Sequence, residues 1–424
     1  MSLTFLALHL LLLFLSPSPA TSTTFPGDIE ALKSLKSAID PASITPGSCL
    51  STWSFAAGDP CDNLFAGDLF TCGLRCDLSV SSFLRVTDIS LDPAAYSGAL
   101  SAALFGLPYL QSFDVSDNLL HGPIPNPTSA SSLRRLALSS NAFSGEIPLS
   151  IGSISSLEEL FLDNNRLSGP IPPSIANLRN LKRLEVQSNK LSGDLPDLNG
   201  LSGLYFFDAS DNALSGPIAD KLPTSLVQVA MRNNKFDGVL DGEATVRRLG
   251  FLQVLDLSHN ALSGPVPSQL FDHPSLEQLT LSFNGFTALN PPRWSGATTS
   301  RLIAVDLGHN RIDGWLPGFM AAMPRLTAVS LEYNRFTGLI PYQYALRAVA
   351  AAMVGGGGVP FQRLVLAGNY LYGPIPVLLM GLKQGGLISL GDNCLFRCPR
   401  YLFFCQGGRQ KSLQVCKDFN PVIP

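Results

Sequence analysis

The sequence predicts an α/β repeat solenoid, a fold in which short parallel strands of successive units stack into one long sheet. Three observations predict it. A pattern of apolar residues, asparagine and glycine recurs along most of the chain, and its period lies in the low twenties. All eight cysteines fall outside the repeats, in one cluster before them and one after them. Because a unit of this length buries its apolar face only against a neighbouring unit, the units must stack.

The repeated unit is clearest at residues 157–172, which read LEELFLDNNRLSGPIP. The apolar residues five and three positions before its asparagine alternate with polar ones, which predicts a short strand with one buried face. This pattern and period define a leucine-rich repeat, and we expect about 12 to 13 units. The asparagines follow one another at steps of 22 to 26 residues, with one step of 35: Asn118, Asn141, Asn165, Asn189, Asn212, Asn234, Asn260, Asn284, Asn310, Asn334, Asn369 and Asn393.

Each asparagine follows its strand where the chain must turn inside the stack. Its amide can donate to and accept from turn backbone that would otherwise be buried unpaired, so we expect an asparagine ladder. Four residues later most units have a glycine such as Gly169, which tolerates backbone angles that other residues resist. Proline tends to follow, as at Pro172. Since proline has no N–H, we expect an irregular segment there, away from the main sheet.

The segment LSGPIP at 167–172 is similar to the plant-type extracellular leucine-rich repeats of receptor-like proteins and receptor-like kinase ectodomains. The resemblance covers roughly residues 28–393. It implies a right-handed superhelix with disulfide-stapled caps at both ends. It also implies a non-catalytic protein without a cofactor, which binds a peptide or protein ligand on a concave face and acts in receptor-complex signalling or defence. A membrane receptor kinase is the implied partner.

The first 84 residues predict a signal peptide followed by an N-terminal cap. In residues 1–20 the apolar run of about thirteen residues is shorter than the ~20 of a bilayer span, and the small residues at its end suit cleavage. A retained anchor is the alternative. Within the cap, residues 21–84, apolar positions of one periodic face predict a helix over 28–39. The helix and the following Trp53 resemble the family's cap, which covers the first strand.

The cysteines predict two disulfides in each cap. Each cluster of four allows three pairings, and the sequence does not choose among them. Zinc binding is the alternative for four cysteines, but a secreted protein favours disulfides, and we expect no metal. The two clusters are Cys49, Cys61, Cys72 and Cys76 before the repeats, and Cys394, Cys398, Cys405 and Cys416 after them.

The solenoid is expected over residues 85–393, with one insertion at 342–360. The insertion contains an alanine-rich, helix-prone stretch at 344–354, followed by four glycines. Two interpretations stay open. It is a lengthened turn with a flexible glycine hinge, or it contributes to a ligand site, as extra segments between repeats do in related receptors.

A C-terminal cap is expected over residues 394–424, where the sequence shows no long apolar run and no kinase signature. We therefore expect a protein without a transmembrane segment, secreted to the apoplast or cell wall, with peripheral association with the plasma membrane as a further option. The basic residues of this cap would suit contact with an acidic wall polysaccharide. The net charge of −3 gives no reason to expect nucleic-acid binding.

Candidate ligand-binding residues lie on the exposed face of the predicted sheet, six, four and two positions before each asparagine, with a rim one position before it. Exposed aromatic residues beside arginine are typical of binding hot spots. A first patch has this composition: Phe161, Asp163, Arg183, Glu185, Phe206, Asp208 and Arg232. A second patch is a rim column with one ring per unit, close enough to stack or to grip an extended peptide: His259, Phe283, His309 and Tyr333. The alternative is that these rings only cover the asparagine ladder.

Two acid–histidine pairs, Asp256 with His259 and Asp306 with His309, do not predict a metal or catalytic site. They are two strands apart, about 10 Å, so one ion bound to both is awkward at ligand distances near ~2 Å. No nucleophile is placed beside them in a pocket. We therefore expect no enzyme. Besides a recognition protein, two functions remain: an inhibitor of a secreted enzyme, similar to polygalacturonase-inhibiting proteins, and a cell-wall scaffold.

Overall fold

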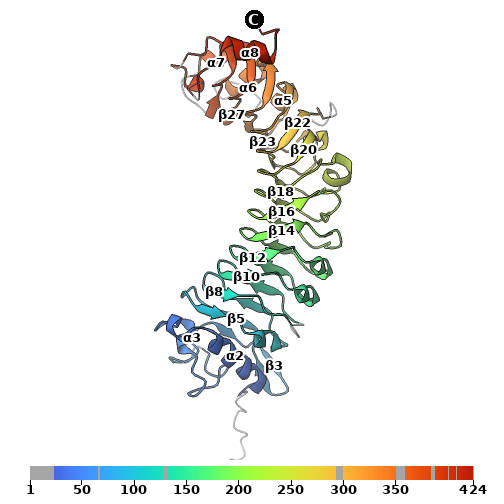
Figure 1. Ribbon diagram of the computed structural model, residues 1–424. Coiled ribbons are helices and arrows are strands. Elements are labelled where there is room, and N and C mark those ends of the chain that lie inside the picture. Colours follow the sequence, from blue (N-terminus) through green and yellow to red (C-terminus); the bar gives the residue numbers. More distant parts are fainter. Residues whose placement is uncertain are drawn as a thin grey trace, which may run out of the picture.

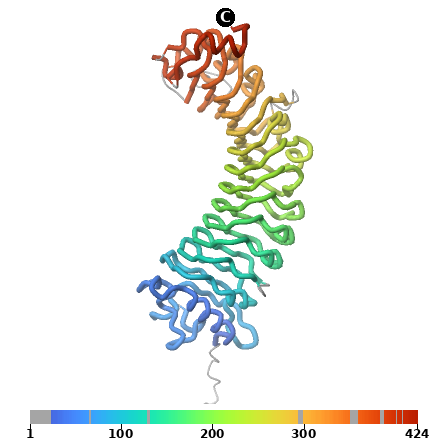
Figure 2. Tube along the Cα trace, in the orientation of Figure 1, coloured from blue at the N-terminus to red at the C-terminus, as the bar shows by residue number. Residues whose placement is uncertain are grey.

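The computed structural model of the 424-residue chain is an elongated, curved rod of stacked coils, with a cap at each end (Figure 1). Figure 2 shows the trace winding in one direction from the N-terminal to the C-terminal cap. The predicted signal peptide lies outside the described residues, and so does the predicted glycine hinge. The structure describes residues 23–64, 67–127, 132–292, 299–349, 359–382, 387–399, 401–406 and 408–423.

One side of the rod is a sheet of fourteen described strands, in which thirteen are parallel and β2 (Leu74–Arg75) pairs antiparallel at the N-terminal edge. This confirms the predicted solenoid and its number of units. The parallel strands are β5 (Asp88–Ser90), β7 (Ser112–Asp114), β9 (Arg135–Ala137), β11 (Glu159–Phe161), β13 (Arg183–Glu185), β15 (Phe206–Asp208), β17 (Gln228–Ala230), β19 (Val254–Asp256), β21 (Gln278–Thr280), β23 (Ala304–Asp306), β25 (Ala328–Ser330), β27 (Arg363–Val365) and β29 (Leu387–Ser389).

The segment after each asparagine forms further strands, where the sequence led us to expect an irregular segment. In several units the backbone groups of neighbouring units pair as far as the glycine and the proline follows these bonds, whereas Pro265 and Pro374 lie within their strands. Gly169, for example, ends its strand at φ 76°, in the left-handed region. The described strands are β6 (Ser97–Ala99), β8 (Leu119–Gly122), β10 (Ala142–Gly145), β12 (Arg166–Gly169), β14 (Lys190–Asp194), β16 (Ala213–Gly216), β18 (Lys235–Phe236), β20 (Ser263–Val266), β22 (Gly285–Leu289), β24 (Asp313–Trp315), β26 (Arg335–Gly338) and β28 (Tyr370–Pro374).

Short helical turns form the outer side of the rod, and leucines fill the space between them and the sheet. In the unit of Asn165, Leu160 and Leu162 are fully buried. Alternation along the strand therefore places one row in the core and the other on the exposed face, as predicted. The described turns are η3 (Ala102–Gly106), η4 (Leu149–Ser153), η5 (Pro173–Asn177), η6 (Gly242–Val246), η7 (Ser268–Leu270), α5 (Gly318–Ala322), α6 (Tyr342–Val349) and α7 (Val377–Met380).

The predicted asparagine ladder is present. In Asn165, Nδ2 donates to the carbonyl oxygens of Leu162 and Asp163 at 3.2 and 3.0 Å, and to Leu138 of the preceding unit at 2.8 Å. Its Oδ1 accepts a hydrogen bond from the N–H of Phe143 at 3.0 Å. Each asparagine thus pairs backbone groups of two adjacent units, which fixes the spacing between their strands.

The N-terminal cap begins with β1 (Thr23–Thr24) and the predicted helix, observed as α2 (Pro26–Ala38). Trp53 is buried beneath it and donates its indole N–H to the carbonyl of Cys72 at 3.0 Å. The cysteines pair as Cys49–Cys72 and Cys61–Cys76. The remaining cap elements are η2 (Pro41–Ser43), α3 (Cys49–Thr52), β3 (Leu78–Val80) and β4 (Phe83–Arg85).

The C-terminal cap contains β30 (Cys394–Phe396), η9 (Phe403–Cys405) and α8 (Leu413–Phe419). Its disulfides join Cys394 to Cys416 and Cys398 to Cys405. All eight cysteines of the chain are therefore paired, and the zinc alternative is wrong.

The predicted helix of the insertion is observed as α6, which begins at Tyr342, two residues before the expected start, and is described as far as Val349. Tyr344 is fully buried and donates its hydroxyl to the carbonyl of Pro317 at 3.0 Å. Arg347 is buried as well. Its guanidinium donates to carbonyl oxygens of the adjacent unit and to one near the end of the insertion: Ala321, Met323, Pro324, Leu326 and Val359. The described part of the insertion is thus packed into the solenoid.

Candidate ligand-binding face

The exposed face of the main sheet holds the predicted site residues in two separate patches, and the structure corrects one expectation. Asp163 was expected to be exposed, but its side chain is buried. Its carboxylate accepts hydrogen bonds from the hydroxyl of Ser139, in the neighbouring unit, and from Nδ2 of Asn164 at 2.7 Å. The other predicted residues are at least partly exposed.

In the first patch, arginine and phenylalanine alternate along the sheet. The guanidinium of Arg135 lies 4.4 Å from the ring centre of Phe161, and Arg183 lies 5.6 Å from Phe161 and 4.1 Å from Phe206. Arg135 belongs to the same row as Arg183 and was not among the predicted site residues. Cation–π contacts of this kind stabilise the surface by themselves.

Carboxylates complete the pairing within this first patch. Arg135 forms ion pairs with Glu159 at 2.7 Å and with Asp114 at 3.3 Å, and Arg183 pairs with Glu185 at 2.5 Å. Burial is the main cause that raises the pKa of the Asp208 carboxyl above its usual value. Since the charged groups satisfy one another within the sheet, a ligand there would have to replace existing contacts.

In the second patch the four rings form a continuous stack, as expected from the strand spacing. Ring centres are 4.0 Å apart for His259 and Phe283, 4.0 Å for Phe283 and His309, and 4.5 Å for His309 and Tyr333, with interplanar angles of 12°, 10° and 22°. We call these four residues the ring column. Beyond Tyr333, a Cβ atom at Gly368 would lie 2.5 Å from the tyrosine ring, so the glycine leaves room for it.

The ring column occupies strained backbone. All four residues have φ between 48° and 55°, in the left-handed region that bulky side chains rarely adopt. In preceding units the same position is held by smaller residues, of which Asn and Asp tolerate this conformation better: Asp117, Ser140, Asn164, Ser188, Asp211 and Asn233. Because the ring faces lie against one another, it is mainly the ring edges that face solvent, with Phe283 42% and Tyr333 45% exposed. The left-handed backbone itself belongs to the turn of every unit, and what is particular to these four units is the bulky ring placed on it.

The acid–histidine pairs serve local structure. Asp256 accepts hydrogen bonds from the N–H and hydroxyl of Ser258 at 3.0 and 2.7 Å, and Asp306 accepts one from the N–H of Gly308 at 2.9 Å. Both histidines are engaged in the ring column. Within the described residues no three His, Cys, Asp or Glu side chains come together to hold a metal ion.

A hollow of about 130 Å³ lies on the same units as the ring column, over β21 to β27. Small side chains at Ala304 and Ala328 form it, in the row that Arg183 and Phe206 occupy in the first patch. Four polar side chains also line it: Thr280, Asp306, Ser330 and Arg363. Sequence reasoning missed this site, although alanine at two successive exposed positions was a visible signal.

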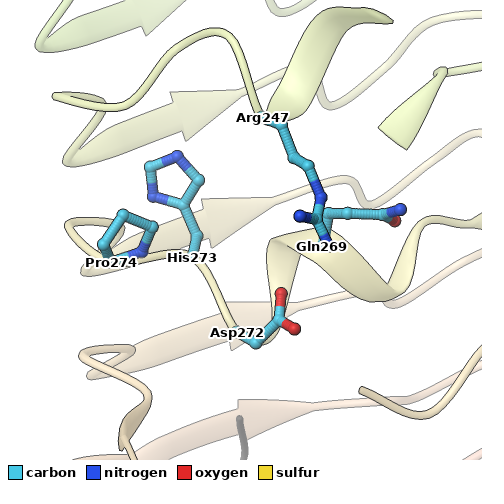
Figure 3. A pocket seen from close by; sticks show the side chains of 5 residues that line it. All are labelled: Arg247, Gln269, Asp272, His273 and Pro274. Atoms are coloured by element: carbon cyan, nitrogen blue, oxygen red, sulfur yellow. The ribbon is translucent and has the colours of Figure 1, made fainter. Parts of the chain in front are cut away.

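A second hollow, of about 260 Å³, lies on the outer side of the rod, away from the sheet face (Figure 3). Arg247, Gln269, Asp272, His273 and Pro274 line it, and the ring of His273 lies beside Pro274 and points away from Arg247 and Gln269. Nδ1 of His273 accepts hydrogen bonds from two backbone N–H groups of the next turn. The histidine therefore closes a turn of the solenoid.

Comparisons with known proteins agree with this fold. The family model for the Leucine Rich Repeat matches residues 132–154, 156–178 and 251–272. Protein STRUBBELIG-RECEPTOR FAMILY 3 of Arabidopsis thaliana is 31% identical over 149 residues, which are 35% of this chain and 17% of that relative. The ectodomain of the receptor kinase GASSHO1/SCHENGEN3 of Arabidopsis thaliana, solved in complex with CASPARIAN STRIP INTEGRITY FACTOR 2, is 30% identical with a TM-score of 0.68. The chain is a leucine-rich repeat protein of the plant receptor-kinase ectodomain type.

A second solved receptor ectodomain is also similar to this leucine-rich repeat protein. The plant peptide hormone receptor RGFR1, in complex with RGF2, is 25% identical with a TM-score of 0.64 over 77% of this chain. The chain covers 50% of that receptor ectodomain and 40% of the GASSHO1/SCHENGEN3 ectodomain, so it spans half or less of their length. No described helix of the protein is both long and apolar enough to cross a membrane.

Proposed function

We propose that this leucine-rich repeat protein is a secreted, non-catalytic recognition module that binds an extended peptide on the exposed face of its main sheet. The site is the strip of the sheet over β21 to β27 that includes the hollow and is bordered on one side by the ring column. We call this strip the trough. The observation that carries the proposal is this hollow, with the strained ring column along its side. The disulfides in both caps support an extracellular location, because such bonds persist in oxidising compartments.

The shape of the trough suits an extended chain. Four strands, β21 to β27, span roughly 14 Å at a spacing of about 4.8 Å, which matches about four or five residues of extended peptide at ~3.3 Å each. Ser282 and Gly308, between the hollow and the ring column, are small. The first patch is the weaker candidate, since a ligand there would displace ion pairs and cation–π contacts that are already formed.

The resemblance to receptor ectodomains supports a peptide as the ligand. The two solved ectodomains described above were each determined in complex with a second component, and one is named a peptide hormone receptor. We extend the proposal to a membrane-bound receptor kinase as the partner to which the bound peptide is presented.

The test compares peptide capture by the wild-type protein and by two sets of variants. In one set, Phe283→Asn and Tyr333→Asn remove rings of the column and place a residue that tolerates left-handed backbone. In the other, Phe161→Ala and Phe206→Ala remove the aromatic residues of the first patch. Peptides extracted from the apoplast are passed over each immobilised protein and the retained ones are identified by mass spectrometry.

We expect the ring-column variants to lose the peptides that the wild type retains, and the first-patch variants to keep them. Urea unfolding midpoints serve as the control. Those of the ring-column variants should stay close to the wild-type value, because the backbone strain that asparagine relieves offsets the ring stacking that is lost. Equal retention by all four variants and the wild type would reject the trough as the binding site.

A further inference from the structure

Acidic and hydroxyl side chains converge at Gly308, next to Asp306 and Ser330 in the lining of the hollow. A Cβ atom at this position would lie 3.2 Å from Oδ1 of Asp306, 3.2 Å from Cγ of Glu332 and 3.4 Å from Oγ of Ser330. These distances are too short for a side chain at this position, so the glycine is what allows the side chains of Asp306, Glu332 and Ser330 to lie this close together.

The hydroxyl of Ser330 points to a missing partner. Ser330 is 3% exposed, and its Oγ has no hydrogen-bond partner within the described structure. Buried hydroxyl groups nearly always have partners, since an unpaired one is unfavourable relative to water. Ser330 lines the hollow, so a ligand atom entering the hollow can supply the partner.

The two acidic side chains are also available. Asp306 accepts one backbone hydrogen bond, from Gly308, and neither Asp306 nor Glu332 forms an ion pair with any described residue. This end of the hollow therefore attracts a positively charged group. A lysine or arginine head has several N–H donors and would satisfy the carboxylates and Ser330 together.

The opposite end of the hollow carries the opposite charge. Arg363, on β27, lines it two strands away from Asp306 and forms no ion pair among the described residues. By contrast, the arginines of the first patch are paired with carboxylates: Arg135, Arg183 and Arg232. The guanidinium of Arg363 is therefore free to bind a carboxylate of a ligand.

We propose that the hollow selects a peptide in which a lysine or arginine and an acidic residue are two positions apart. The basic head would lie between Asp306 and Glu332, with a hydrogen bond to Ser330, and the acidic side chain would face Arg363. In an extended chain, residues i and i+2 point to the same side about 6.6 Å apart, while strands β23 and β27 are about 9.6 Å apart. The long side chain of Arg363 can bridge the difference. This inference rests on the proposed function.

The test uses the full secreted chain and a synthetic library of ten-residue peptides whose ends are acetylated and amidated, so that only side chains carry charge. We expect the wild type to enrich sequences with Lys or Arg two positions from Asp or Glu. With Arg363→Glu, the preference for the acidic residue should be replaced by a preference for a second basic residue, while the first basic residue remains preferred.

Ser330→Ala separates binding from folding. For the best-enriched peptide we expect about a tenfold loss of affinity, the effect of one hydrogen bond to a charged group. The urea midpoint should be unchanged or higher, because the variant removes an unpaired buried hydroxyl. Ser210→Ala, another buried serine beside the exposed sheet face but outside the hollow, is the matched control and should leave the affinity unchanged.

The outcomes distinguish this inference from the proposed function. If the wild type enriches peptides that Phe283→Asn does not, but without the charge pattern, the inference is wrong and the trough remains a binding site. An unchanged sequence preference in Arg363→Glu would also overturn it. If the wild type enriches nothing beyond Phe283→Asn, both the inference and the proposed function fail.

Discussion

Asp28 and Arg85 join the N-terminal helix to the first turn of the solenoid through a buried bidentate ion pair. The carboxylate of Asp28 accepts hydrogen bonds from Nε and Nη2 of Arg85 at 3.0 and 2.7 Å, and from the N–H of Val86 at 3.0 Å. The guanidinium is enclosed between the rings of Phe25 and Tyr109, each 4.3 Å from it. The pair thus connects the cap, β4 and the first two units at one point.

Removing one partner of this pair should destabilise the cap strongly. In Asp28→Asn the buried guanidinium of Arg85 loses its counter-charge, and we expect the free energy of unfolding to fall by about 3–5 kcal/mol. Urea unfolding followed by circular dichroism measures the loss. Hydrogen exchange at residues of α2 shows whether the loss is confined to the cap.

A double variant supplies the control for this prediction. Asp28→Leu with Arg85→Met replaces the pair by apolar side chains of similar size. We expect it to recover part of the lost stability, since an apolar pair avoids the desolvation of two charges, while the N–H of Val86 loses its acceptor. A double variant no more stable than Asp28→Asn would show that the pair itself, rather than an unpaired charge, determines the stability of the cap.

The asparagine ladder yields a second prediction, at Asn369, which is fully buried. Its Nδ2 donates to the carbonyls of Leu331, Leu366 and Ala367, and its Oδ1 accepts from the N–H of Phe336. In Asn369→Leu these backbone groups stay buried without partners, and we expect a loss of about 3 kcal/mol in the free energy of unfolding.

The matched control is Asn180→Ala. Asn180 is exposed and makes one described side-chain hydrogen bond, to the carbonyl of Ser155, so its loss should change stability by less than about 0.5 kcal/mol. Urea unfolding of both variants checks the difference. Similar midpoints for the two would mean that the ladder bonds contribute little beyond those of a surface asparagine.

Features that repeat in every unit could be predicted from the sequence. The position of Asn165 relative to Leu160 and Leu162 fixes the strand, its buried face and the ladder. The ring column followed from the same register, because residues at one repeat position must lie about one strand spacing apart. The pattern within one unit and the stacking of similar units are sufficient to predict such features.

Features that depend on particular neighbours could not be predicted. Asp163 occupies an exposed position of the pattern but is buried, because Ser139 in the preceding unit binds its carboxylate. The hollow arises only where small residues meet in adjacent units. Arg363 lies at its edge because β27, which follows the insertion in the sequence, pairs with β25. The cysteine pairings likewise depend on the path of each cap. In these cases contacts between side chains of different units determine the structure, and the pattern of a single unit carries no information about such contacts.

His273 occupies, on the outer side of the rod, the position that Leu178 has in an earlier unit. Its Nδ1 accepts hydrogen bonds from the N–H groups of Ser275 and Leu276 at 3.3 and 3.1 Å, so the ring is held in its neutral form. Burial is the main cause that lowers the pKa of the His273 imidazole below its usual value of 6.5. An imidazole with a lowered pKa in the folded state makes stability depend on pH.

The sign of this dependence follows from proton binding. Above about pH 7 His273 is neutral in both the folded and the unfolded chain and has no effect. As the pH falls below about 6.5, the unfolded chain binds a proton that the folded chain resists, so stability decreases, by up to about 1.4 kcal/mol per pH unit, until the lowered pKa is reached. His273→Leu should lose this contribution, and the wild type should therefore lose more stability than the variant on acidification.

Urea unfolding of the wild type, His273→Leu and His121→Gln between pH 4.5 and 8 measures this difference. His121 is exposed, and we expect its variant to follow the wild type at every pH. His273→Leu also removes the two hydrogen bonds to Nδ1, so its stability will be offset from the wild type by a constant amount above pH 7. Only the change of this offset below about pH 6.5 reports on the protonation of His273. A constant offset over the whole range would show that burial of this histidine has no effect on stability in acid.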